Sequence, residues 1–118
     1  MSLRVTIELP AGPFVAGEPV RGQVTVRGGD GIRGLEVSLV QVEWSKDYEA
    51  VGRREPPQSL AGGPVPDGRQ LPFELTLPLD APPEVQTGHG GLAWEVQAKA
   101  DVRGPDAIVG ERISVSPD

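Results

Sequence analysis

The sequence contains no cysteine, a single histidine and only five aromatic side chains among 118 residues. Without cysteine the chain can form no disulfide, has no thiolate nucleophile and offers no cysteine-based metal site. No apolar run approaches the ~20 residues that cross a bilayer, and no apolar stretch of signal-peptide length opens the sequence. Together these absences predict a cytoplasmic protein without a membrane span.

Positive charge is also scarce, because 11 Lys and Arg stand against 17 Asp and Glu, which gives a net charge of −6. The acidic residues form no run, which favours a solvated surface. The longest basic cluster is Arg53-Arg54, and Glu55 follows it at once. Binding to nucleic acid depends on Lys and Arg that neutralise phosphates, so we do not expect a nucleic-acid partner.

What the sequence does contain is strict alternation of apolar and polar residues, clearest at residues 71–79 and 92–102. Such alternation is typical of a strand with one buried face and one solvated face. The 16 Gly and 13 Pro fall between the alternating runs and predict turns. Five further runs predict strands, at residues 4–9, 20–27, 32–44, 48–54 and 107–115. This pattern predicts one all-β domain over residues 1–118, an antiparallel β-sandwich of about seven strands, although a barrel also fits.

Several positions carry more specific expectations. In the run 32–44 the buried parity changes after Leu39, which predicts either a bulge or a strand that passes into a different environment. Trp44 then lies under a loop or on an exposed patch, and we favour burial. Phe14 is expected to anchor a loop against the core, and Gly17 to adopt a positive φ. Gly22, inside a strand, predicts a bulge or a close backbone approach.

No catalytic, cofactor-binding or metal-ligating residues are predicted. His89, the single histidine, lies in a Gly-rich loop and has no second His or Cys to share a metal. Asp80 and Glu84 are close in sequence, but acids in a loop of a β-sandwich are ordinarily solvated. Phosphate-cradling, nucleophile-elbow and calcium-loop patterns are missing. We therefore expect a protein that is not an enzyme and needs no cofactor.

Three stretches, taken in order, carry a resemblance to a known family. They are residues 14–26, with an aromatic residue, Gly-Glu and an alternating apolar run, residues 32–39, and residues 71–78 followed by Pro82-Pro83 and residues 91–100. The chain resembles the arrestin-like superfamily, in particular its amino-terminal immunoglobulin-like sandwich. That superfamily includes eukaryotic arrestins, a retromer subunit and bacterial sporulation-control proteins, and its members usually hold two such sandwiches in tandem. The resemblance implies an immunoglobulin-like fold and an adaptor or scaffold that binds proteins.

Our preferred hypothesis is therefore a non-enzymatic protein-interaction module whose partner is unknown. Its contacts would come from the long segments 55–68 and 80–91 or from an unpaired sheet edge, and a homodimer would supply a second sandwich. The alternative is a β-sandwich that binds a small molecule or carbohydrate, with Trp44 and Tyr48 as its candidate aromatic residues. A third hypothesis is a hydrolase that uses acidic residues, for which the sequence nominates no pair.

Overall fold

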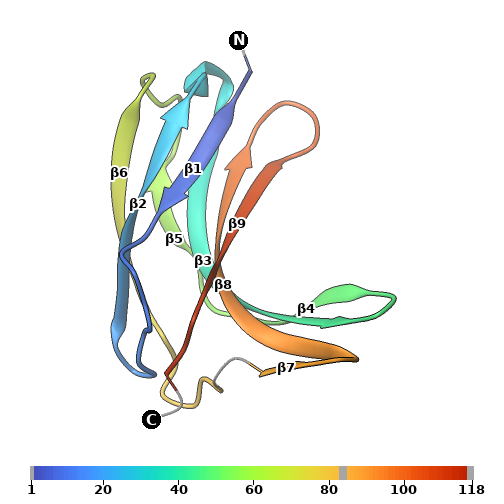
Figure 1. Cartoon of the computed structure of the whole chain (residues 1–118). Helices are drawn as coiled ribbons and strands as arrows, with labels where there is room; N and C mark the ends of the chain where they lie inside the picture. The colour runs from blue at the N-terminus through green and yellow to red at the C-terminus, as the bar shows by residue number, and fades with distance from the viewer. Residues whose placement is uncertain (1, 83–84, 117–118) are drawn as a thin grey trace.

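A computed structural model describes residues 2–82 and 85–116, and shows two antiparallel β-sheets packed face to face (Figure 1). The fold class predicted from the alternation is thus confirmed. Pro83 and Glu84, which entered the sequence argument, lie outside the described residues. The described chain holds nine strands and a single turn of 3-10 helix at Gly29–Gly31.

All seven predicted strands are present, with ends shifted by a few residues. The nine strands are β1 (Arg4–Glu8), β2 (Pro19–Arg27), β3 (Gly34–Ser45), β4 (Glu49–Arg54), β5 (Gln58–Ala61), β6 (Arg69–Thr76), β7 (Val85–Thr87), β8 (Gly90–Asp101) and β9 (Ala107–Ile113). The two additional strands, β5 and β7, lie inside the segments 55–68 and 80–91 that we expected to be loops. Strands of three or four residues are too short to show an alternation, and they form here because long neighbours supply their hydrogen-bonding partners.

The two sheets differ in size. The small sheet has the order β1-β2-β6. The large sheet is built on the pairing of β3 with β8, which runs without a break from Gly34 opposite Asp101 to Ser45 opposite Gly90. Both of its edges are divided, because β4 and β5 pair with successive parts of β3, while β7 and β9 pair with successive parts of β8. Each long central strand therefore has two short neighbours on its outer side.

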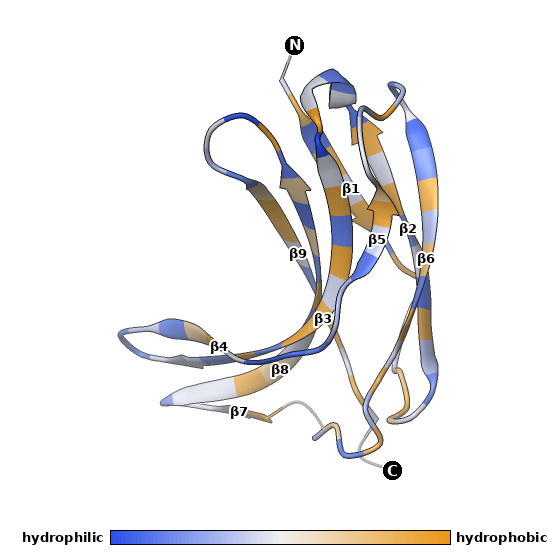
Figure 2. Ribbon diagram, turned by 180° about the vertical axis from the view of Figure 1, so that it is seen from behind, coloured by the Kyte–Doolittle hydropathy of each residue, from blue (hydrophilic) through white to orange (hydrophobic). Residues whose placement is uncertain are grey.

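One half of the large sheet packs on the small sheet and encloses the core. Apolar side chains of one parity fill the space between the sheets, as the alternating colours along β3, β6 and β8 show in Figure 2. Trp94 is the largest fully buried side chain, and only 1% of it is exposed. The partly buried Phe14 packs against this core, which confirms its expected role as a loop anchor.

The other half of the large sheet bends away from the small sheet (Figure 1). We call this half the wing: it consists of β4, β7 and the ends of β3 and β8 that pair with them, residues 40–45 and 90–92. Val40 and Val42 of the wing, and Ala93 opposite Val42, are buried but do not belong to the core cluster. The parity change in β3 therefore reflects a change of environment, since its register with β8 contains no bulge.

Two glycines behave as the sequence suggested. Gly17 has φ 85°, in the region that favours glycine. Gly22 continues its strand without a bulge, opposite Phe73. A Cβ added there would lie 2.6 Å from the Glu8 carbonyl oxygen and 2.8 Å from the Phe73 ring. Close approach of neighbouring strands, one of the two predicted explanations, is therefore what requires glycine at this position.

Candidate functional site

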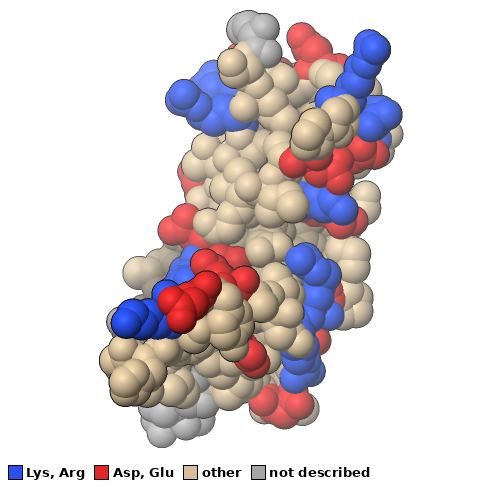
Figure 3. Space-filling model, turned by 90° about the vertical axis from the view of Figure 1, so that its right-hand side faces the viewer, with Lys and Arg blue, Asp and Glu red and all other residues tan. Residues whose placement is uncertain are grey.

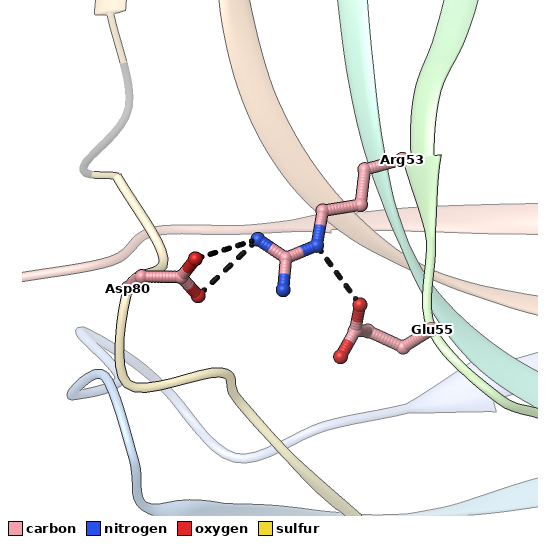
Figure 4. Close-up of polar contacts among 3 residues, drawn as sticks. All are labelled: Arg53, Glu55 and Asp80. Carbon is pink, nitrogen blue, oxygen red and sulfur yellow. Dashed lines mark hydrogen bonds and ion pairs between the residues drawn. The ribbon is translucent and has the colours of Figure 1, made fainter.

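The most connected charged group in the described chain is Arg53, which extends from β4 toward the segment that follows β6 (Figure 4). Its Nε donates to a Glu55 carboxylate oxygen at 3.0 Å, and its Nη1 donates to both Asp80 oxygens at 3.2 Å. The guanidinium carbon also lies 5.8 Å from the centre of the Trp94 ring. One cation thus joins the wing, the 77–82 segment and the edge of the core.

Desolvation acts to lower the pKa of Arg53, but hydrogen bonds and attraction from Asp80 and Glu55 outweigh it and raise the pKa above its ordinary value. The guanidinium is therefore charged at neutral pH. Both carboxylates are already committed to it, and no nucleophile or histidine belongs to the group. The geometry favours a clamp that holds the 77–82 segment against the wing, rather than an acid–base pair.

Trp44 lies on the face of the wing that points away from the small sheet. Arg112 of β9 stacks on its ring at 4.2 Å, and the Arg112 guanidinium lies 3.6 Å from the carboxylate of Glu49. Gly91 lies against the ring, because a Cβ there would come within 2.2 Å of a Trp44 ring atom. Trp44 is therefore half-buried rather than part of the core. Its ring already carries a guanidinium, which leaves less of it for a sugar to stack on.

The wing end of the molecule carries most of the exposed large apolar side chains. Five of the six such residues in the described chain lie on the wing or on the segments before β2 and after β6, and we call them the apolar end: Val15, Tyr48, Val51, Leu79 and Val85. Leu79 is the most exposed, at 88%, and Tyr48 follows at 60%. The segment before β2 and the segment after β6 lie side by side, because the Gly17 N–H donates to the Leu77 carbonyl at 2.9 Å. Val15 and Leu79 thus lie on adjoining segments, since a Cβ at Gly17 would come within 2.5 Å of a Leu79 side-chain atom, whereas Val51 lies on the wing face that carries Trp44. Exposed apolar side chains on adjoining segments are typical of a contact surface for another molecule.

Sequence reasoning identified Tyr48 as a candidate but missed Leu79. Leu79 continues the parity of Leu75 and Leu77, which are buried, so the alternation predicts that it is buried too. The strand, however, ends at Thr76. Pro78 was the available signal, because proline donates no ladder hydrogen bond and so marks the end of a strand.

His89 lies at the exposed turn between β7 and β8, and its backbone N–H donates to the Thr87 hydroxyl at 3.2 Å. No group of three His, Cys, Asp or Glu side chains within residues 2–82 and 85–116 is arranged to hold a metal. Two surface hollows of about 440 Å³ each lie elsewhere, one over Gly34 and Asp101 and one between β1 and β9. Neither contains His89, so the structure does not bring it together with other reactive groups.

The outer face of the small sheet is polar. The Glu8 carboxylate accepts hydrogen bonds from Thr25 and, at 3.2 Å, from Gln23, and these bonds lower the pKa of Glu8. Arg21 pairs with Glu74 on the neighbouring strand. Figure 3 views the molecule from the side on which the wing projects and shows basic and acidic side chains next to one another. Neither surface therefore presents a field of one sign.

The layered sheets, divided edges and bent large sheet define an arrestin-like β-sandwich. No profile of a known protein family matches the sequence, and no curated protein matches it. Among solved structures, the chain is similar to the sporulation control protein Spo0M of Bacillus subtilis, with a TM-score of 0.69 and 26% sequence identity. The match covers 98% of this chain and 49% of that one, so the chain spans about half the length of its structural relative.

This similarity confirms the arrestin-like resemblance inferred from the sequence, including its sporulation-control branch. The described part of the chain also contains no helix long and apolar enough to cross a membrane.

Proposed function

We propose that this chain is a cytoplasmic, non-enzymatic protein-interaction module of arrestin-like form, which binds a partner protein through its apolar end. The observation that carries the proposal is the exposure of Leu79, at 88%, on a segment that adjoins the segment of the exposed Val15. Similarity to a sporulation control protein supports a regulatory or adaptor role. The ion pair of Arg53 and Asp80 ties the segment that presents Leu79 to the wing, and a restrained segment costs less entropy to order when a partner binds.

Site-specific photocrosslinking tests this proposal. A benzophenone amino acid replaces Leu79 in the full chain, which is then irradiated in a lysate of the source organism. We expect a discrete protein adduct, because an apolar side chain this exposed lies within the proposed contact. Adding Leu79→Asp to a chain that carries the crosslinker at position 85 should lower adduct yield about tenfold, if Leu79 is a main contact.

Ile108 provides the matched control. It is also apolar and 59% exposed, but it lies near the start of β9, away from the wing. A crosslinker at position 108 should give no discrete adduct. Equal adducts at positions 79 and 108, or none at position 79, would contradict a docking role for the apolar end.

A further inference from the structure

The second feature of the wing is an open sheet edge. This edge belongs to β4, which is not the only strand paired on one side, because β1, β5 and β7 also have one neighbour each in the described chain. On β6, Pro72 has no N–H to donate, and the Glu74 N–H is taken by the Gln58 side chain at 3.1 Å. Just after β9, the Phe14 N–H donates to the Ser114 carbonyl at 2.8 Å. Within the described chain, β4 is a six-residue strand that pairs with β3 on one side and with no strand on the other.

The hydrogen-bonding pattern shows which β4 residues face this open side. The Ser45 N–H donates to the Tyr48 carbonyl and the Glu55 N–H to the Leu39 carbonyl, so the bonded pairs fall on the odd-numbered residues of β3. Their partners include Ala50 and Arg53. Glu49, Val51 and Arg54 alternate with Ala50 and Arg53, because the register shift between Gln41 and Val42 places one extra residue in β4. The N–H and C=O groups of Glu49, Val51 and Arg54 therefore point away from β3 and can bond to an added strand.

The sequence of this edge is complementary to itself. If a second β4 runs antiparallel about the Val51–Gly52 bond, Glu49 of each copy lies opposite Arg54 of the other. Glu49 and Arg54 share the wing face that carries Trp44, since they pair with Trp44 and Val40. A shift of the added strand by two residues would place Glu49 opposite Gly52 or Pro56, and both Glu49–Arg54 pairs would be lost. In the first of these registers Arg54 would instead lie opposite Asp47, which is outside β4. Among the residues of β4 itself, the charges therefore favour the register that pairs Glu49 with Arg54.

In the single chain the side chains of Glu49 and Arg54 both have partners over the sheet, and in the paired arrangement they would turn toward the open edge. Arg54 donates to the Ser38 hydroxyl and to the Gln97 amide oxygen, each at 3.2 Å, and has no carboxylate partner within the described residues. Glu49 has Arg112 as a partner at 3.6 Å, which leaves room on its carboxylate for a second cation. Val51 is 45% exposed and would be covered by the second copy.

We propose that two copies of this chain pair through antiparallel β4 strands, with Glu49 of each copy bound to Arg54 of the other, which joins the two large sheets into one. This inference does not depend on the proposed function, because it concerns purified protein alone. Leu79 and Val15 lie outside β4, so a dimer of this kind still presents part of the apolar end.

Sedimentation equilibrium on four purified chains tests the dimer: wild type, Glu49→Arg, Arg54→Glu and the double variant Glu49→Arg/Arg54→Glu. We expect the wild type to dimerise below about 1 mM, and each single reversal to weaken dimerisation at least about tenfold, because like charges then face each other. The double variant restores opposite charges across the interface and should regain the dimer. Restoration separates charge pairing from a general effect of either substitution.

Arg21→Glu is the matched control, because it reverses the same kind of charge on the small sheet and should leave the dimer intact. Far-ultraviolet circular dichroism confirms that each variant is folded. A wild type that remains monomeric at about 1 mM overturns the proposal, as that corresponds to a negligible affinity. A dimer that survives both single reversals, or that the double variant fails to regain, also overturns it.

Discussion

Trp94 shows how one residue combines packing with an unusual polar feature. It pairs with Gln41 of β3 and Ile113 of β9, is 1% exposed, and lies under the Arg53 guanidinium. Its indole Nε1 is buried and has no acceptor among the described residues. Such a donor costs free energy, so the contribution of Trp94 to stability comes from its apolar area and not from a hydrogen bond.

Replacing Trp94 with Ala should lower the free energy of unfolding by about 3–5 kcal/mol, because the substitution leaves a large cavity in the core. Trp94→Phe should cost clearly less, since it keeps most of the ring and removes the unpaired indole N–H. Urea titration followed by circular dichroism measures both values. Trp44→Ala is the matched comparison: it removes the same side chain from a half-buried site outside the core. A smaller loss for Trp94→Ala than for Trp44→Ala would show that Trp94 is not the central core residue.

At the same scale, the sequence was informative where a residue's own stereochemistry sets its role. The positive φ of Gly17 and the close packing at Gly22 follow from the missing side chain. Trp44 and Leu79 were harder, because their environments depend on where the sheet bends and where a strand ends. Neither the bend of the sheet nor the end of the strand follows from the identity of the residue itself. Both determine which side chains are exposed at the candidate site.

At the scale of elements, the long strands were predictable because each repeats its pattern over eight or more residues. Strand β5 was not, since its backbone partners on β3 are distant in sequence. Strand β7 pairs with the adjoining start of β8, but its three residues are too few to show an alternation. The clamp that joins Arg53 to Asp80 was equally hidden, because its members lie 27 positions apart in the sequence. Periodicity thus predicts the sandwich, while the details of the wing follow from tertiary contacts.

The clamp also leads to an element-scale prediction. Asp80→Asn removes the negative charge from an exposed ion pair, so the free energy of unfolding should fall by less than about 1 kcal/mol. The local effect should be larger, because Asp80 ties the 77–82 segment to the wing. Hydrogen exchange at the Ala81 amide, which donates to the Pro78 carbonyl at 3.0 Å, should accelerate several-fold. Arg21→Gln, which breaks a pair on the other sheet, should leave that amide unchanged; unaltered exchange in Asp80→Asn would rule out the clamp.

At the scale of the whole molecule, the bent wing changes both shape and available surface. The sandwich half buries its apolar faces against a second sheet, whereas the wing has no second sheet against its exposed faces. Two features cover part of the apolar surface of the wing: the side chains of Val40, Val42 and Ala93 are buried near the bend, and the Arg112 guanidinium stacks on Trp44. What remains exposed, at the apolar end and the β4 edge, is the surface on which both proposals depend.

This shape is measurable in solution. The Cα radius of gyration is 14.9 Å, whereas a compact chain of this length has a value of about 13.5 Å, and the principal extents are 41 × 32 × 22 Å. Small-angle X-ray scattering on the monomeric Arg54→Glu variant should therefore give a radius clearly above the compact value, because a projecting wing moves mass outward. Scattering from the wild type at rising concentration should increase toward an elongated dimer, since β4 pairing joins the two molecules at their wings. A monomer at the compact value would mean that the wing folds back onto the sandwich, which would cover the apolar end and close the β4 edge.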